Sequence, residues 1–131
     1  MFRFGLKSVK ILEEVQPHLR SLATKVISIS PIDFAITSGL RTLEEQQTLY
    51  KQGKSKTLNS KHLTGQAIDF VPWHSGAAHF EDINSCCVLA GIFLAVARES
   101  LCTKIRVGAL WNHNLVLSNT FLDAYHVELV Y

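Results

Sequence analysis

The run of residues from Cys86 to Ala97 is the feature that most constrains the fold. It contains only apolar residues and one glycine, and it is too short to cross a membrane, which takes about 20 such residues. We therefore expect a buried helix over about residues 81–99 that packs across a sheet. The chain has 131 residues, 47% of them hydrophobic and 18% charged, as is typical of one globular domain.

Shorter helices and β-rich segments flank this central helix. Helical spacing of apolar residues, Ser8 as an N-cap, Pro17 at a first turn and a Thr42–Glu45 capping box predict further helices. The predicted helices cover about residues 9–15, 17–28 and 43–51, and the predicted strands cover about residues 33–38, 66–71, 104–108 and 125–130. Pro72 is expected to end its strand, and residues 112–123 fit either a loop or a hairpin. These elements predict a single α+β domain over residues 1–131, with helices packed against a small, mostly antiparallel sheet.

Three residues far apart in the chain form a candidate metal site. His62 and His126 each offer an imidazole nitrogen, and Asp69 offers a carboxylate oxygen. Two nitrogens and one oxygen leave a fourth tetrahedral position open, as in catalytic zinc sites. Each residue taken alone has an ordinary alternative. His62 could be structural or exposed, His126 could hydrogen-bond to Glu128, and Asp69 could cap a helix or pair with a lysine.

The surroundings of Asp69 favour the metal interpretation. Asp69 shares a strand face with Ala67 and Val71, and a carboxylate among apolar neighbours needs a partner because its burial is costly. Gly65 permits a close approach between this strand and the loop that carries His62. Asp123 lies three residues before His126, close enough to serve the same site.

Together these residues form a pattern that resembles a known family. The pattern is Ser60-x-His62-x-x-Gly65-x-Ala67-x-Asp69 followed by Asp123-x-x-His126. It is similar to the signature of the LAS-type, or VanY-like, zinc peptidases, which include D-Ala-D-Ala carboxypeptidases and dipeptidases as well as phage endolysins. The resemblance continues at residues 38–42, 49–53 and 126–129. It spans about residues 2–130 and is closest to the single-domain L-alanyl-D-glutamate endolysins.

The resemblance implies a role for each matching position. It implies Zn²⁺ ligands at His62, Asp69 and His126, a general base at Asp123, a catalytic and substrate-steadying arginine at Arg41, and substrate contacts at Ser60 and Trp111. Two of these positions have structural alternatives. Arg41 could form a surface salt bridge with Glu44 or Glu45, and Trp111 could pack in the core. Leu110 stands where many relatives carry an acidic residue before a tryptophan, so any role of that acid in supporting a ligand is lost or moved.

The implied function is hydrolysis of the L-alanyl-D-glutamate bond in the stem peptides of bacterial peptidoglycan. A D-Ala-D-Ala carboxypeptidase would use the same ligands, and a cell-wall-binding module could keep the fold without catalysis. The net charge of +2 is too small to indicate a nucleic-acid partner, despite the nuclease-like run from Asn112 to Asn114.

The first ten residues lack the apolar stretch of a secretory signal. We therefore expect a protein made in the cytoplasm of a bacterial host, without stable membrane insertion. It is expected to be a monomer and to reach the cell wall or periplasm after a holin-type partner opens the membrane.

The remaining histidines and cysteines carry no recognisable motif. His74 and His79 lie in a polar segment and are expected to be exposed, with a regulatory metal contact left open. The cysteines, at positions 86, 87 and 102, include no CxxC pair, so we expect reduced thiols and no cysteine zinc site.

Overall fold

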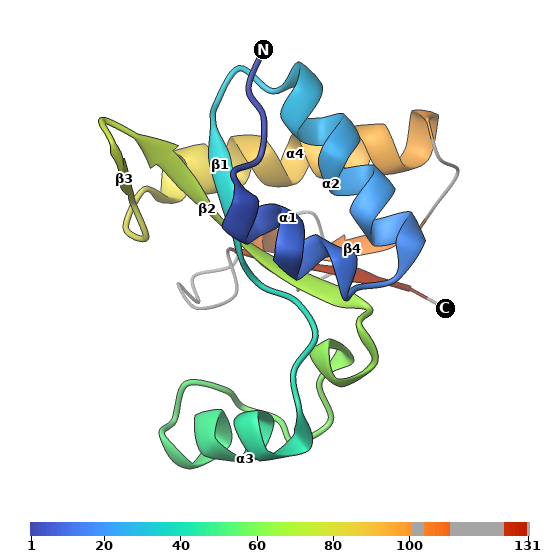
Figure 1. Cartoon of the computed structure of the whole chain (residues 1–131), viewed down its shortest axis with the longest axis vertical. Helices are drawn as coiled ribbons and strands as arrows, with labels where there is room; N and C mark the ends of the chain where they lie inside the picture. The colour runs from blue at the N-terminus through green and yellow to red at the C-terminus, as the bar shows by residue number, and fades with distance from the viewer. Residues whose placement is uncertain (101–103, 111–124, 131) are drawn as a thin grey trace.

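The computed structural model describes residues 1–100, 104–110 and 125–130 of the chain, and Figure 1 shows their arrangement. The helices are α1 (Leu6–Glu13), α2 (Pro17–Ile29), α3 (Leu43–Lys51) and α4 (Ile83–Glu99), with short 3₁₀ turns η1 (Lys61–Thr64) and η2 (Gly108–Leu110). The strands are β1 (Phe34–Ser38), β2 (Ala67–His74), β3 (Ala77–Ala78), β4 (Ile105–Val107) and β5 (His126–Leu129). The segment 112–123, which the sequence left undecided, lies outside the described residues.

The strands form one sheet in the order β1-β2-β5-β4, with β3 paired to the far end of β2. Every strand pair among the described residues is antiparallel. The predicted α+β fold with a small antiparallel sheet is therefore confirmed. Strand β2 is the longest and contacts β1, β3 and β5, so residues on β2 lie near the middle of the sheet.

The core lies between the sheet and the helices α1, α2 and α4 (Figure 1). The predicted central helix is confirmed as α4, whose buried residues include Leu89 and Phe93. The ring of Phe93 packs at 5.4 Å from that of Phe70 and at 5.7 Å from that of Phe34, which joins α4 to β1 and β2. No helix in the described ranges is both long and apolar enough to span a membrane.

Helix α3 lies well apart from the other three helices, at the bottom of Figure 1. The predicted capping box is present: Glu45 N–H donates to the Thr42 hydroxyl, and the Glu45 carboxylate accepts from Thr42 N–H. The buried residue of α3 is polar, Gln46. This helix therefore contributes little to the hydrophobic core, and its buried face serves another purpose, described below.

Two boundary predictions were wrong. Helix α1 begins at Leu6 instead of after Ser8, because the Ser8 hydroxyl accepts a buried hydrogen bond from Ile36 N–H and does not cap the helix. Strand β2 continues through Pro72 to His74. The hydrogen bond from Trp73 N–H to the Asp33 carbonyl places Pro72 between ladder bonds, so its missing N–H removes none to β1.

Gly39 follows β1 and is buried against α1. A Cβ at this position would lie 2.8 Å from a methyl carbon of Ile11 and 2.8 Å from one of Val15. Both belong to β-branched side chains with little rotamer freedom. The position therefore requires glycine for lack of space.

We expect Gly39→Ala to lower the free energy of unfolding by about 1–3 kcal/mol, because the added methyl overpacks this contact. The matched control is Gly91→Ala on the exposed face of α4, where an added Cβ meets nothing within 4 Å. That change should stabilise by roughly 0.5–1 kcal/mol through helix propensity. Urea denaturation of both variants tests the difference, and equal midpoints would contradict the packing described here.

Candidate metal centre

The pairing of β2 with β5 brings two of the predicted ligands together. In this antiparallel register Asp69 lies directly opposite His126, and Ala67 lies opposite Glu128. The intervening pair, Ile68 and Val127, is fully buried in the core. Since side chains alternate between faces, Asp69, His126 and Glu128 share the face that points away from the core.

His62 arrives from η1, just before β2. The Ser60 hydroxyl accepts from His62 N–H at the start of this turn, and Gly65 ends it in the left-handed conformation with φ 69°. A Cβ on Gly65 would lie 3.3 Å from the Glu14 carbonyl and the Val15 Cα. The predicted close approach at Gly65 is thus present, but its neighbour is the junction of α1 and α2.

The side chain of His62 is 2% exposed and has a fixed orientation. Its Nδ1–H donates to the Gly39 carbonyl at 2.7 Å. Because a carbonyl can only accept, Nδ1 carries the proton and Nε2 keeps its lone pair. That Nε2 lies 3.3 Å from Asp69 Oδ1 and, among the described residues, makes no hydrogen bond. A buried acceptor without a donor is costly, and a metal ion is the partner that suits it.

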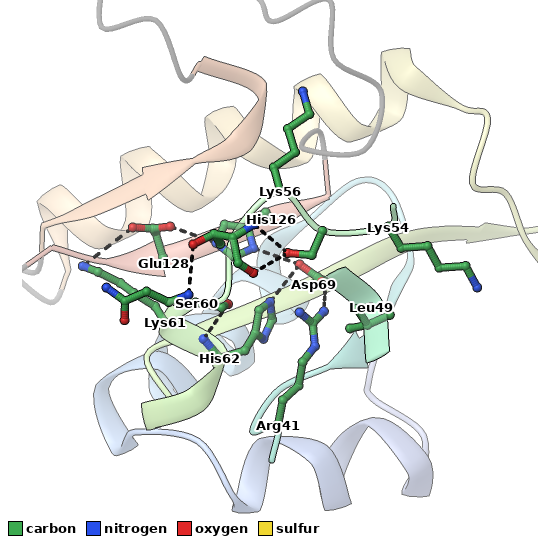
Figure 2. A pocket seen from close by; sticks show the side chains of 13 residues that line it. Arg41, Leu49, Lys54, Lys56, Ser60, Lys61, His62, Asp69, His126 and Glu128 are labelled. Atoms are coloured by element: carbon green, nitrogen blue, oxygen red, sulfur yellow. Dashed lines mark hydrogen bonds and ion pairs between the residues drawn. The ribbon is translucent and has the colours of Figure 1, made fainter. Parts of the chain in front are cut away.

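The three predicted ligands converge. One ligand atom from each of His62, Asp69 and His126 lies within 4.8 Å of the others, and Figure 2 shows the side chains pointing toward one another. In the part of the chain that the structure describes, this is the one such group of histidine, cysteine and acidic residues. The residues present therefore fit a metal ion held by two nitrogens and one oxygen.

The histidines His74 and His79 do not join such a group. Their rings stack in parallel, with centroids 3.6 Å apart. His74 Nε2 lies 3.1 Å from Asp82, and His79 Nδ1 lies 3.4 Å from Glu81. The side chain of His74 is half exposed, as the sequence suggested, whereas that of His79 is 25% exposed.

Charge is concentrated around the site. Burial acts to raise the pKa of Asp69, but the hydrogen bond from His126 and the nearby ring of His62 outweigh it and hold that pKa far below its usual value. Burial acts to lower the pKa of His126, but hydrogen bonds to Asp69 and Glu128 raise it to about 9. Without a metal, His126 is therefore a cation between two carboxylates at neutral pH. A metal ion would replace that positive charge, since it binds the neutral imidazole.

Arg41 belongs to the same cluster. Its Nη2 lies 3.0 Å from Asp69 Oδ2, and its side chain is 16% exposed. Its Nε donates to the Ser38 hydroxyl at 3.1 Å, and its backbone N–H donates to the His62 carbonyl at 2.9 Å. The ion pair of Arg41 is thus with Asp69 and not with Glu44 or Glu45, the alternative left open by the sequence.

Gln46 is a site residue that sequence reasoning missed. It is fully buried, and its Oε1 accepts from Arg41 Nη1 at 3.1 Å. Its Nε2 donates to the Ser55 hydroxyl and the Thr57 carbonyl. Gln46 therefore ties Arg41 to the loop before Ser60, which explains why α3 buries a polar face. No spacing in the sequence marks this residue.

Glu128 was considered only as an alternative partner of His126, and the structure shows that both contacts exist at once. His126 Nδ1 lies 3.0 Å from Asp69 Oδ1, while His126 Nε2 donates to Glu128 Oε1 at 2.9 Å. Glu128 in turn lies 3.7 Å from Lys61 Nζ. The signal available in the sequence was its position two residues after His126, on the same face of a strand.

A cleft of about 340 Å³ opens beside the three ligands, a size suited to a small ligand or a peptide segment. Ser60 and Arg41, the described residues for which substrate contacts were predicted, line this cleft, and so do Lys54, Lys56 and Glu128 (Figure 2). The predicted general base and the predicted aromatic contact, Asp123 and Trp111, lie outside the described residues.

Known proteins resemble this chain along almost its full length. Residues 1–130 match the family described as phage L-alanyl-D-glutamate peptidase. The L-alanyl-D-glutamate peptidase of Escherichia phage T5 is 36% identical over 137 residues, which cover 98% of each protein. The crystal structure of the Serratia marcescens L-Ala D-Glu endopeptidase ChiX superposes with a TM-score of 0.83 at 29% identity, covering 98% of this chain and 90% of that one. The chain that places His62, Asp69 and His126 around one point therefore belongs to the phage L-alanyl-D-glutamate peptidase family.

Proposed function

We propose that this protein is a zinc-dependent endopeptidase that hydrolyses the L-alanyl-D-glutamate bond of bacterial peptidoglycan stem peptides. The whole chain, residues 1–131, would act as one catalytic domain. The observation that carries the proposal is the convergence of His62, Asp69 and His126 in a member of a family of L-alanyl-D-glutamate peptidases. Two imidazoles and a carboxylate are the ligand set of several zinc hydrolases.

His62 Nε2, an Asp69 oxygen and His126 Nδ1 would hold the ion. Bound there, zinc would supply a Lewis acid for the scissile carbonyl and a water of lowered pKa. The protein must add a group that moves protons. We assign that role to Asp123, which would take a proton from the attacking water and return it to the amine of the departing D-glutamate.

Arg41 would stabilise negative charge that develops on the scissile carbonyl oxygen. Its position supports this role, since the guanidinium is held by Ser38 and Gln46 and contacts Asp69. A guanidinium fixed from three directions need not reorganise during the reaction. The entropy of ordering this side chain is already lost when the protein folds.

The lining of the cleft suits an acidic peptide. Lys54, Lys56 and Lys61 line it together with Arg41, and a stem peptide containing D-glutamate carries free carboxylates. We propose that Ser60 and Trp111 contact this substrate directly. The cationic side chains would favour its approach through long-range attraction.

We further propose that the protein works as a monomer at the cell wall or periplasm of a bacterium, after release through a membrane lesion made by a holin-type partner. A relative of this chain, the L-alanyl-D-glutamate peptidase of Escherichia phage T5, supports a role at the cell wall. The proposed function involves no nucleic-acid partner and no stable insertion into a membrane.

Removal of the metal should abolish hydrolysis of purified peptidoglycan, and Zn²⁺ should restore it. His62→Ala should lose both metal binding and activity, because it removes a buried ligand. The matched control is His18→Ala, which removes an exposed histidine of α2 and should leave both unchanged. Turbidity of permeabilised cells and metal content report the result. Wall binding without any hydrolysis in the wild type would instead identify a cell-wall-binding module.

The bond cleaved can be identified from the products. Mass spectrometry of digested peptidoglycan should find fragments with a new N-terminal D-glutamate. Release of free D-alanine in their place would establish the alternative, a D-Ala-D-Ala carboxypeptidase, which the same metal ligands could serve.

Asp123→Asn should reduce kcat by about 10²- to 10⁴-fold, the range for loss of a general base, while zinc content stays at the wild-type level. Arg41→Lys should reduce kcat by about 10²- to 10³-fold, because an ammonium cannot reproduce the three side-chain contacts of the guanidinium. Rate measurements on zinc-loaded variants test both roles. Wild-type kcat in either variant would remove that residue from the mechanism.

A further inference from the structure

The two histidines of the metal centre present opposite ring atoms to Asp69. His62 uses Nε2, at 3.3 Å from Oδ1, and His126 uses Nδ1, at 3.0 Å from the same oxygen. In each ring the remaining nitrogen is engaged elsewhere. His62 Nδ1 donates to the Gly39 carbonyl, whereas His126 Nε2 donates to the carboxylate of Glu128. One ring is thus fixed by the backbone and the other by a side chain that can be changed by mutation.

Glu128 is well placed to fix its histidine. Its side chain is 12% exposed, and Oε1 lies 2.9 Å from His126 Nε2. An ionised carboxylate only accepts hydrogen bonds, so in the neutral imidazole that binds a metal it keeps the proton on Nε2 and leaves the lone pair on Nδ1. A free imidazole exchanges its proton between the two nitrogens, and only one of the two forms offers Nδ1 to a metal.

The carboxylate is itself held in place. Oε2 of Glu128 lies 3.7 Å from Lys61 Nζ, and Lys61 also donates to the Leu129 carbonyl. Arg106 of β4 lies opposite Glu128 in the strand register. Figure 2 shows the chain of contacts from Lys61 through Glu128 to His126. Lys61 precedes His62, so this chain connects the segment that carries one ligand to the side chain that orients the other.

We infer that Glu128 is a positioning residue, which locks His126 in the tautomer that presents Nδ1 to the metal. The inference rests on the proposed metal-dependent function and adds a residue to it. Glu128 contacts the ring nitrogen that does not face Asp69, so it acts on the metal through His126 and does not act as the general base. Carboxylates in this position also raise the basicity of the imidazole ligand.

The zinc dissociation constants of Glu128→Ala and Glu128→Gln, measured by competition with a chromophoric chelator, test the inference. Glu128→Ala should weaken binding by about 10- to 100-fold, the range for loss of such a partner. Glu128→Gln should weaken it less than Glu128→Ala does, because the amide oxygen still accepts from Nε2–H. Glu128→Gln is nearly isosteric, so it keeps the test informative if the alanine variant folds poorly.

The matched control is Glu81→Ala, which removes another glutamate paired with a histidine, at 3.4 Å from His79 Nδ1 and 77% exposed. Its zinc affinity should equal that of the wild type. Cobalt(II) bound in place of zinc adds a spectroscopic readout. Its visible absorption, which reports ligand geometry, should change in Glu128→Ala and stay unchanged in Glu81→Ala.

The outcomes separate this inference from the function on which it rests. Wild-type zinc affinity in both Glu128 variants, with binding still lost in His62→Ala, would overturn the inference alone. Absence of zinc binding by the wild type would overturn both. Unchanged affinity with a large loss of kcat in Glu128→Gln would mean that Glu128 takes part in the chemistry directly, which also contradicts a positioning role.

Discussion

The antiparallel pairing of β2 with β5 is the constraint on which the rest of the site depends. It sets Asp69 opposite His126 while it buries Ile68 against Val127. Side chains on a strand alternate with a period of two, so a slip of one residue would turn the ligands into the core and the core residues outward. The hydrophobic effect that fixes this register therefore also fixes the metal centre. Stability and ligand geometry are determined by the same strand pair.

The third ligand is held by different means. His62 comes from a short turn, and its ring is set by the carbonyl of Gly39, a residue that has no room for a side chain. Arg41 links His62 to the strand pair. Its backbone N–H donates a hydrogen bond to the His62 carbonyl, and its guanidinium donates one to Asp69. Each ligand therefore has a supporting partner that is itself packed or bonded. Such support allows a site to be ordered before its ion and substrate arrive.

The fold could be predicted from the sequence where the local signal was strong. The apolar run in α4, the capping box at Thr42 and the β-rich segments gave the α+β class and most element positions. The errors arose where tertiary contacts override local preference. Ser8 has the chemistry of a helix cap, but its hydroxyl oxygen accepts a hydrogen bond from Ile36 N–H of β1. Pro72 has the chemistry of a strand breaker but falls where the ladder needs no N–H.

The candidate ligands were also predictable, because His62, Asp69 and His126 carry a spacing that resembles a known signature. The residues that support these ligands, Gln46 and Glu128, were less predictable from the sequence. Gln46 contacts Arg41 because α3 lies beside the cleft, and no local pattern encodes that approach. The contact between Glu128 and His126 was predicted only as an alternative to metal ligation, whereas the two are compatible since an imidazole has two nitrogens. Metal ligands can thus be identified from a sequence more readily than the residues that orient them.

The most direct measurement of the central claim is anomalous diffraction at the zinc edge from crystals of the zinc-loaded protein. The account predicts one strong peak per chain, about 2.0–2.2 Å from His62 Nε2, an Asp69 carboxylate oxygen and His126 Nδ1. A peak bound through the opposite nitrogen of either ring, or a peak that shares no ligand with this group, would contradict it.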